Sequence, residues 1–320
     1  MWHAGASMEP ARSAWQRWGW LLRWGGTAAG IAYVAHLIDP VEAWSAFKKI
    51  PPLVFAAATA LVALNVVVGA LRWRVLLTAY GADTRPTLAR ATKLYFISFF
   101  YNNYLPGAVA GDVVRGVVTR EVFGERGATA GLAVVLVERA LGLFGVFLLL
   151  AIGLAAAGAA VDTGSLGMWS VLGIGGSLGL VLALPFARRL APLLPGRLRT
   201  IAERVPELSS ARAFAIAAAY SVLTQVLIAV AGYILLHAIE PEVDLGASLL
   251  IVPLAAATTF LPITVGGAGA REAVYVTFGA SLFHMAKSDA LAASLALWLA
   301  HLVTGAAGGI MQLTERRARK

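Results

Sequence analysis

The chain has 320 residues, of which 59% are hydrophobic and only 13% are charged, with a mean hydropathy of +0.76. Because a soluble domain has roughly 25% charged residues, these values exclude a soluble protein and indicate a helical integral membrane protein. Continuous apolar runs exclude a transmembrane β-barrel, whose strands alternate over about ten residues. The chain contains no cysteine, which excludes disulfides and thiolate metal sites.

The net charge of +9 and the isoelectric point near 10.2 are compatible with a nucleic-acid partner. The basic residues are, however, spread over short loops between apolar runs. Cytoplasmic loops of membrane proteins are enriched in lysine and arginine, which explains the charge more simply. We therefore expect no nucleic-acid partner.

Residues 1–17 have the composition of an N-terminal interfacial segment, because tryptophan and arginine together suit the headgroup region of a bilayer. No small-residue cleavage site follows the first apolar run, so we expect this run to stay as a span. Span two ends in Arg72, Trp73 and Arg74, which is typical of a membrane boundary. We expect six full spans and a basic cytoplasmic tail, at about residues 18–37, 53–77, 128–156, 166–186, 213–236, 290–313 and 314–320.

Two further apolar segments, at residues 94–123 and 245–283, are interrupted near their middle. Proline removes a helical donor and glycine tolerates unusual backbone angles. Each half is too short to cross about 30 Å of hydrocarbon, so both segments are predicted to be re-entrant helical hairpins. The breaks share one spacing of leucine, proline, glycine and arginine: Leu105, Pro106, Gly111 and Arg115, then Leu261, Pro262, Gly267 and Arg271.

The positions of the basic loops predict the topology. The positive-inside rule places both termini and the loops near residues 72–93, 115–126 and 188–212 in the cytoplasm. Six spans satisfy this only if each hairpin returns to the side from which it enters. Residues 18–157 and 166–313 then form two halves of opposite orientation, an inverted repeat offset by about 150 to 160 residues. Paired interrupted segments of this kind indicate the substrate site of a transporter.

Two charged residues, Glu138 and Arg139, are expected near the middle of the third span. Eleven helical residues after Gly127 correspond to a depth of about 16 Å. A charge at this depth is costly, which suggests a role. We expect Arg115 or a lipid headgroup as the partner of Glu138, and a carboxylate or a phosphate as the partner of Arg139. The alternative is a structural ion-pair network that holds the span to the hairpin.

Arg115 and Arg271 each lie four residues after a hairpin glycine, near the start of a helix. Helix N-termini and the planar guanidinium both suit phosphate. Asp112 and Glu272 are adjacent counter-charges. The alternative is that the arginines contact lipid passively at the interface. Asn102 and Asn103 are expected either to hydrate a cavity or to cap the break.

The chain shows no pattern for metal or cofactor chemistry. His36, His237, His284 and His301 lack metal-ligand spacing, and no nucleotide motif is evident. Asp112, Glu138 and Glu272 are available as acids or bases, but nothing positions a nucleophile. We therefore expect no cofactor, no metal and no enzymatic activity.

The motifs as a set resemble the family that contains the transmembrane flippase domain of bacterial lysylphosphatidylglycerol synthases, over about residues 20–312. The soluble aminoacyl-transferase domain of those synthases has no counterpart here, so we expect a stand-alone member. The resembling stretches are Phe99–Gly107, Gly111–Arg115, Val137–Arg139 with Leu141 and Gly142, Leu261–Pro262 and Gly267–Glu272, preceded by Arg72–Arg74.

The resemblance implies a flippase or scramblase that moves a phosphate-bearing lipid, either a phospholipid or a polyprenyl-phosphate-linked one, between leaflets. It also implies a bacterial inner-membrane location and membrane lipids as partners. The residues it implies along the path are Asp112, Arg115, Glu138, Arg139, Arg271 and Glu272. Two alternatives stay open: a small-anion secondary transporter, or a non-transporting partner of a membrane glycosyltransferase or lipid-modifying enzyme.

Overall fold

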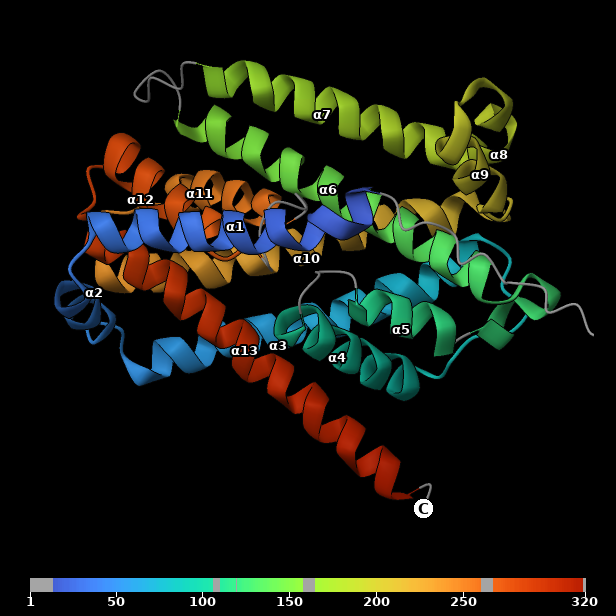
Figure 1. The fold of residues 1–320 in the computed structure, drawn as a ribbon, viewed down its shortest axis with the longest axis horizontal. Coiled ribbons are helices and arrows are strands. Elements are labelled where there is room, and N and C mark those ends of the chain that lie inside the picture. Colours follow the sequence, from blue (N-terminus) through green and yellow to red (C-terminus); the bar gives the residue numbers. More distant parts are fainter. Residues whose placement is uncertain (1–13, 106–109, 119, 158–164, 260–266, 319–320) are drawn as a thin grey trace, which may run out of the picture.

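The computed structural model describes residues 14–105, 110–118, 120–157, 165–259 and 267–318, which form helices and no strands (Figure 1). The α-helices and 3₁₀ helices are, in chain order, α1 (Ala14–Leu37), α2 (Pro40–Phe47), α3 (Pro52–Ala79), α4 (Leu88–Tyr104), α5 (Ala110–Val118), η1 (Arg120–Arg126), α6 (Gly127–Ala157), α7 (Ser165–Ala183), η3 (Leu184–Phe186), α8 (Ala187–Leu190), η4 (Ala191–Leu193), α9 (Gly196–Arg204), α10 (Ala211–Ile239), α11 (Leu245–Thr258), α12 (Ala270–Phe283) and α13 (Lys287–Ala318).

Helical segments long and apolar enough to cross a membrane confirm a polytopic membrane protein. Within the described residues they number five: Pro52–Ala79, Gly127–Ala156, Val171–Leu193, Ala211–Ile239 and Lys287–Thr314. Each matches a predicted span. The predicted first span corresponds to α1, which is not among the five. The total of six spans therefore stays a prediction.

Each predicted interrupted segment contains two short helices that pack on each other, α4 with α5 and α11 with α12. The first segment begins earlier than expected, at Leu88, because the Thr87 side chain caps α4 by accepting from the backbone N–H of Arg90. Gly267 has a φ of 80°, the left-handed conformation expected at a break. Pro106 and Pro262 lie outside the described residues.

Glycines allow α4 to lie in close contact with the helices on either side of it. A Cβ atom on Gly111 of α5 would lie 1.9 Å from the carbonyl oxygen of Ser98, and one on Gly308 of α13 would lie 2.0 Å from that of Phe96. No side chain fits at either distance. Gly111 is therefore required by the packing of the two helices, in addition to any role in the break.

The long helices α3 and α10 pack against each other along the middle of the bundle (Figure 1). Helix α4 lies along α13, helix α11 lies along α6, and α7 lies at the edge against α6. The two larger buried apolar clusters lie among these helices. One includes Leu235, Ile251 and Tyr275, and the other includes Trp73, Leu141 and Phe214.

Candidate functional site

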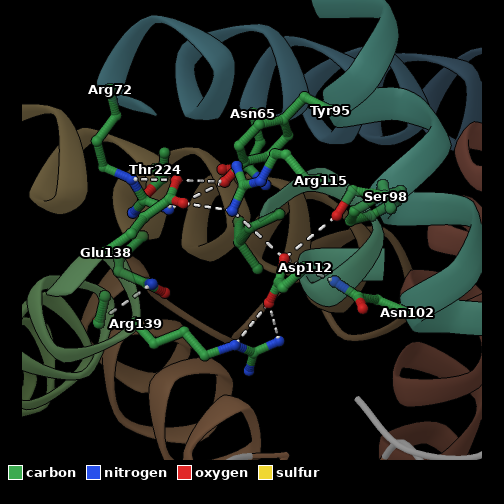
Figure 2. A pocket seen from close by; sticks show the side chains of 14 residues that line it. Asn65, Arg72, Tyr95, Ser98, Asn102, Asp112, Arg115, Glu138, Arg139 and Thr224 are labelled. Carbon is green, nitrogen blue, oxygen red and sulfur yellow. Dashed lines mark hydrogen bonds and ion pairs between the residues drawn. The ribbon is translucent and has the colours of Figure 1, made fainter. Parts of the chain in front are cut away.

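Glu138 of α6 lies at the centre of a buried polar cluster between α3, α4, α5 and α6 (Figure 2). Its side chain is 2% exposed and pairs with Arg115 of α5. Glu138 also accepts from the Tyr95 hydroxyl at 2.8 Å and from Nη2 of Arg72 at 3.0 Å. The expected pairing of Glu138 with Arg115 is confirmed.

Asp112 of α5 forms the second carboxylate of this cluster. Its Oδ2 atom accepts from Nε of Arg139 at 2.7 Å, and its Oδ1 atom accepts from the Ser98 hydroxyl at 3.2 Å. Arg115 also lies 3.4 Å from Oδ1 of Asp112. The carboxylate expected as the partner of Arg139 is therefore Asp112.

Arg115 connects the two carboxylates and is itself packed between aromatic rings. Its guanidinium carbon lies 4.4 Å from the centroid of the Tyr95 ring and 4.9 Å from that of the Trp73 ring. Aromatic faces attract a guanidinium, most strongly where water is excluded. Since Arg115 is 2% exposed, its passive contact with lipid at the membrane interface is excluded.

Arg72 belongs to the cluster, so its assignment to the membrane boundary was wrong. Its Nη1 atom donates to the hydroxyls of Ser221 at 3.2 Å and Thr224 at 3.3 Å on α10, in addition to the bonds with Glu138. Arg74 lies two residues further along α3 and donates to the carbonyl of Pro86. Residues two apart point in different directions on a helix, so one arginine reaches the core and the other reaches the loop. From the sequence, only a helical projection of α3 could have shown that the two arginines point in different directions.

The corresponding arginine of the second hairpin, Arg271, has different partners. It pairs with the neighbouring Glu272, and its guanidinium carbon lies 5.6 Å from the centroid of the Trp298 ring. Glu272 also accepts from the backbone N–H of Gly269 at 2.7 Å, which fixes the start of α12. The repeated motif therefore places an arginine in each interrupted segment, but the residues that surround Arg115 and Arg271 differ.

Two neighbouring cavities lie beside these arginines. The first, of about 190 Å³, is lined by all five charged residues of the cluster: Arg72, Asp112, Arg115, Glu138 and Arg139. The second, of about 290 Å³, is lined by polar residues that include Asn103, Arg139, Arg271, Tyr275 and His301. Both cavities share a wall formed by Phe99, Asn102, Arg139, Gln225 and Ile228.

Asn102 bonds across the break, as one of the two expected roles requires, and also lines both cavities. Its side chain accepts from the backbone N–H of Gly111 at 2.9 Å and so ties the two hairpin helices together. It also donates to Asp112 at 3.3 Å and lines both cavities. Asn103 donates to the carbonyl of Phe99 at 2.8 Å and lines the second cavity.

The fixed charges of the cluster do not cancel. Over the described ranges, no group of three or more histidine, aspartate or glutamate side chains is placed to hold a metal ion. Three arginines and two carboxylates line the first cavity, so its fixed charges leave one excess positive charge. Buried charges are retained where they are paired and hydrogen-bonded, which these contacts provide.

Comparison with known proteins gives two matches. The family model described as "Lysylphosphatidylglycerol synthase TM region" matches residues 20–309, which include every residue of the cluster. A "UPF0104 membrane protein" from Methanothermobacter thermautotrophicus is 35% identical over 79 residues, which is 25% of this chain and 22% of that protein. The match thus spans about a fifth of that relative's length.

Proposed function

Because the chain belongs to the family of lysylphosphatidylglycerol synthase transmembrane regions, we propose that it is a lipid flippase or scramblase. In this proposal, it moves a phosphate-bearing lipid between the leaflets of a bacterial cytoplasmic membrane, with both of its termini in the cytoplasm. The observation that supports the proposal most directly is the pair of neighbouring cavities lined by arginines, of which the first lies beside the first interrupted segment and the second is lined by residues of both segments. Membrane-embedded arginines facing a cavity typically mark a substrate path.

Contacts at the ends of the first interrupted segment support its assignment as a re-entrant hairpin. The backbone N–H of Asp83, before α4, donates to the carbonyl of Val122, after α5, at 3.0 Å. The entry and the exit of this segment therefore lie together. In the second segment, Val243 before α11 and Met285 after α12 belong to one buried cluster.

The packing of the helices supports an inverted repeat. If α3 to α6 correspond to α10 to α13, a two-fold relation makes a contact between α4 and α13 equivalent to one between α11 and α6. Both contacts are present, and α3 packs along its counterpart α10. Inverted-repeat transporters have their substrate site at the interface of the repeats, which is where α3, α6, α10 and α13 contribute to the cavity walls.

In the proposed mechanism, the polar headgroup passes through the two cavities while the acyl chains stay in the bilayer. Arg271 and Arg139 line the second cavity and provide the charge that replaces the headgroup's hydration. Arg115 stabilises the wall through its pairs with Glu138 and Asp112.

One observation favours a second candidate function, a non-transporting partner of a lipid-modifying enzyme or a glycosyltransferase. Glu138 is bonded to Arg72, Tyr95 and Arg115 at once, as in a structural network. In that case, the wild type would exchange no lipid, and replacing Arg115 or Glu138 would destabilise the protein.

Leaflet exchange in proteoliposomes tests the proposal, with headgroup-labelled lipids and a membrane-impermeant quencher. The variants are Arg139→Gln and Arg271→Gln, and the matched control is Arg199→Gln, whose guanidinium forms an exposed pair with Glu203. We expect wild-type exchange to be lost in both cavity variants and retained in the control. No exchange by the wild type, over a panel of lipids and with an imposed proton gradient, would refute the proposal.

A further inference from the structure

Arg139 is the charged residue that the two cavities share. It lines both of them, and its side chain is 28% exposed, whereas those of Arg115 and Glu138 are 2% exposed. Its Nε and Nη2 atoms both contact Oδ2 of Asp112, at 2.7 and 2.5 Å. Figure 2 shows this guanidinium at the edge of the cluster, on the opposite side of Asp112 from Ser98. Arg139 is thus placed to reach a ligand in the second cavity without a change in the helices.

The charged groups of the two cavities do not balance. With His301 counted as neutral, the described residues that line the cavities or pair with their arginines comprise four arginines and three carboxylates. Each of these carboxylates, Asp112, Glu138 and Glu272, already has an arginine partner. A surplus positive charge in a membrane interior is unfavourable unless an anion accompanies it. One ligand with a single negative charge would balance the site.

One residue that lines the second cavity carries a buried hydroxyl. Tyr275 is 1% exposed, and its buried hydroxyl has no hydrogen-bond partner among the described residues. A buried hydroxyl without a partner is unfavourable. Tyr275, Arg271 and Arg139 line the same cavity of about 290 Å³, to which the two arginines bring two cationic donors.

We propose that the second cavity, together with Arg139, binds the phosphate of one headgroup whose net charge is −1, and that Arg139 exchanges Asp112 for this phosphate on binding. A phosphodiester has this charge at neutral pH. The inference deepens the proposed function, on which it rests for the class of ligand, because it specifies a headgroup with net charge −1 instead of a cationic or zwitterionic one. Asp112 then acts as an internal competitor that holds Arg139 while the cavity is empty.

Binding can be measured independently of transport. The full chain in neutral detergent is titrated with dioleoyl phosphatidylglycerol, which has net charge −1, and with dioleoyl phosphatidylcholine, a zwitterion, and bound lipid is counted by native mass spectrometry. We expect phosphatidylglycerol to bind at least about tenfold more tightly than phosphatidylcholine, because the choline cation would add a positive charge to a site that already has a surplus of one. Equal affinity for the two lipids would overturn the proposal.

Three variants separate the proposed site from a structural network. Arg139→Gln and Arg271→Gln should each weaken phosphatidylglycerol binding about tenfold, while Arg199→Gln should not change it. Asp112→Asn should strengthen binding, because it removes the competitor for Arg139 and raises the surplus charge. Weaker binding in a folded Asp112→Asn protein would refute the exchange of partners. If this variant does not fold, unchanged binding in Arg271→Gln would refute the site.

Soluble glycerophosphoglycerol, the deacylated headgroup, distinguishes two sources of the phosphate. Displacement only by the lipid assigns the site to a lipid headgroup, whereas displacement by both with equal affinity assigns it to a soluble phosphodiester; either result supports the phosphate site. Leaflet exchange of phosphatidylcholine with equal binding of both lipids would overturn this inference and leave the flippase proposal standing. Selective binding of phosphatidylglycerol without leaflet exchange of any lipid would support this inference and refute the flippase proposal.

Discussion

Arg115 and Glu138 form an ion pair between α5 and α6 in which both side chains are 2% exposed. A buried pair of this kind adds little net stability over an apolar pair, but it is costly to break, because the remaining buried charge loses one of its few partners. Here the pair joins one helix of the first interrupted segment to α6, which is long and apolar enough to cross a membrane. The position of α5 therefore depends on this contact.

Glu138→Gln is expected to destabilise the protein by about 3–5 kcal/mol, because it leaves Arg72 and Arg115 facing a neutral amide in a buried site. The matched control is Glu203→Gln, which removes an exposed partner of Arg199 and should cost about 0–1 kcal/mol. Reversible unfolding in mixed micelles measures both. Equal stability of the two variants would show that the buried pair has no structural role.

Arg72→Lys is expected to destabilise the protein by about 1.5–3 kcal/mol although it keeps the positive charge. A lysine cannot reproduce the fork that bonds Glu138 on α6 together with Ser221 and Thr224 on α10. Arg74→Lys, two residues away, loses one bond to the carbonyl of Pro86 at the end of the helix and should change stability far less. The same unfolding measurement compares the two variants. Similar losses of stability would contradict the assignment of Arg72 to the buried cluster and of Arg74 to the loop.

Gly308→Ala is expected to separate α13 from α4, because the added methyl group would meet the carbonyl oxygen of Phe96. Overpacking of this kind typically costs about 1–3 kcal/mol. Gly176→Ala on α7 is the control, since nothing lies within 4 Å of its added Cβ atom and alanine is a better helix former. Thermal unfolding should show a lower midpoint for the first variant only, and a native-like midpoint for Gly308→Ala would contradict the packing.

Single-cysteine labelling tests the re-entrant hairpins directly, because the chain has no native cysteine to give background. Cysteines at Arg85 and Glu121 flank the first hairpin, and cysteines at Glu242 and Ala286 flank the second. We expect the first two to react with an impermeant maleimide from the cytoplasmic side and the other two from the opposite side. Labelling of Arg85 and Glu121 positions from different sides would show that the first segment crosses the membrane.

The helices of the fold could be predicted from the sequence because a bilayer imposes strong local rules. Long apolar runs must be helical when their backbone groups have no water to bond, and α3, α6, α10 and α13 match predicted spans within a few residues. The repeated motif likewise predicted α4 with α5 and α11 with α12. The possible partners of Glu138 and Arg139 could be narrowed to a few groups, because a charge near the middle of the membrane requires a counter-charge.

The tertiary structure alone decided which charges meet. Arg72 and Glu138 are separated by 66 residues and Arg72 and Thr224 by 152, so no local pattern relates them. Their contact follows from the packing of α3 between α6 and α10, which is set by side chains far apart in the chain. The same packing gave the repeated arginines unlike surroundings: Arg115 meets Glu138, whereas Arg271 meets Glu272 and Trp298. Local sequence determines where a charge lies along its helix, and the packing of the helices determines what that charge can bind.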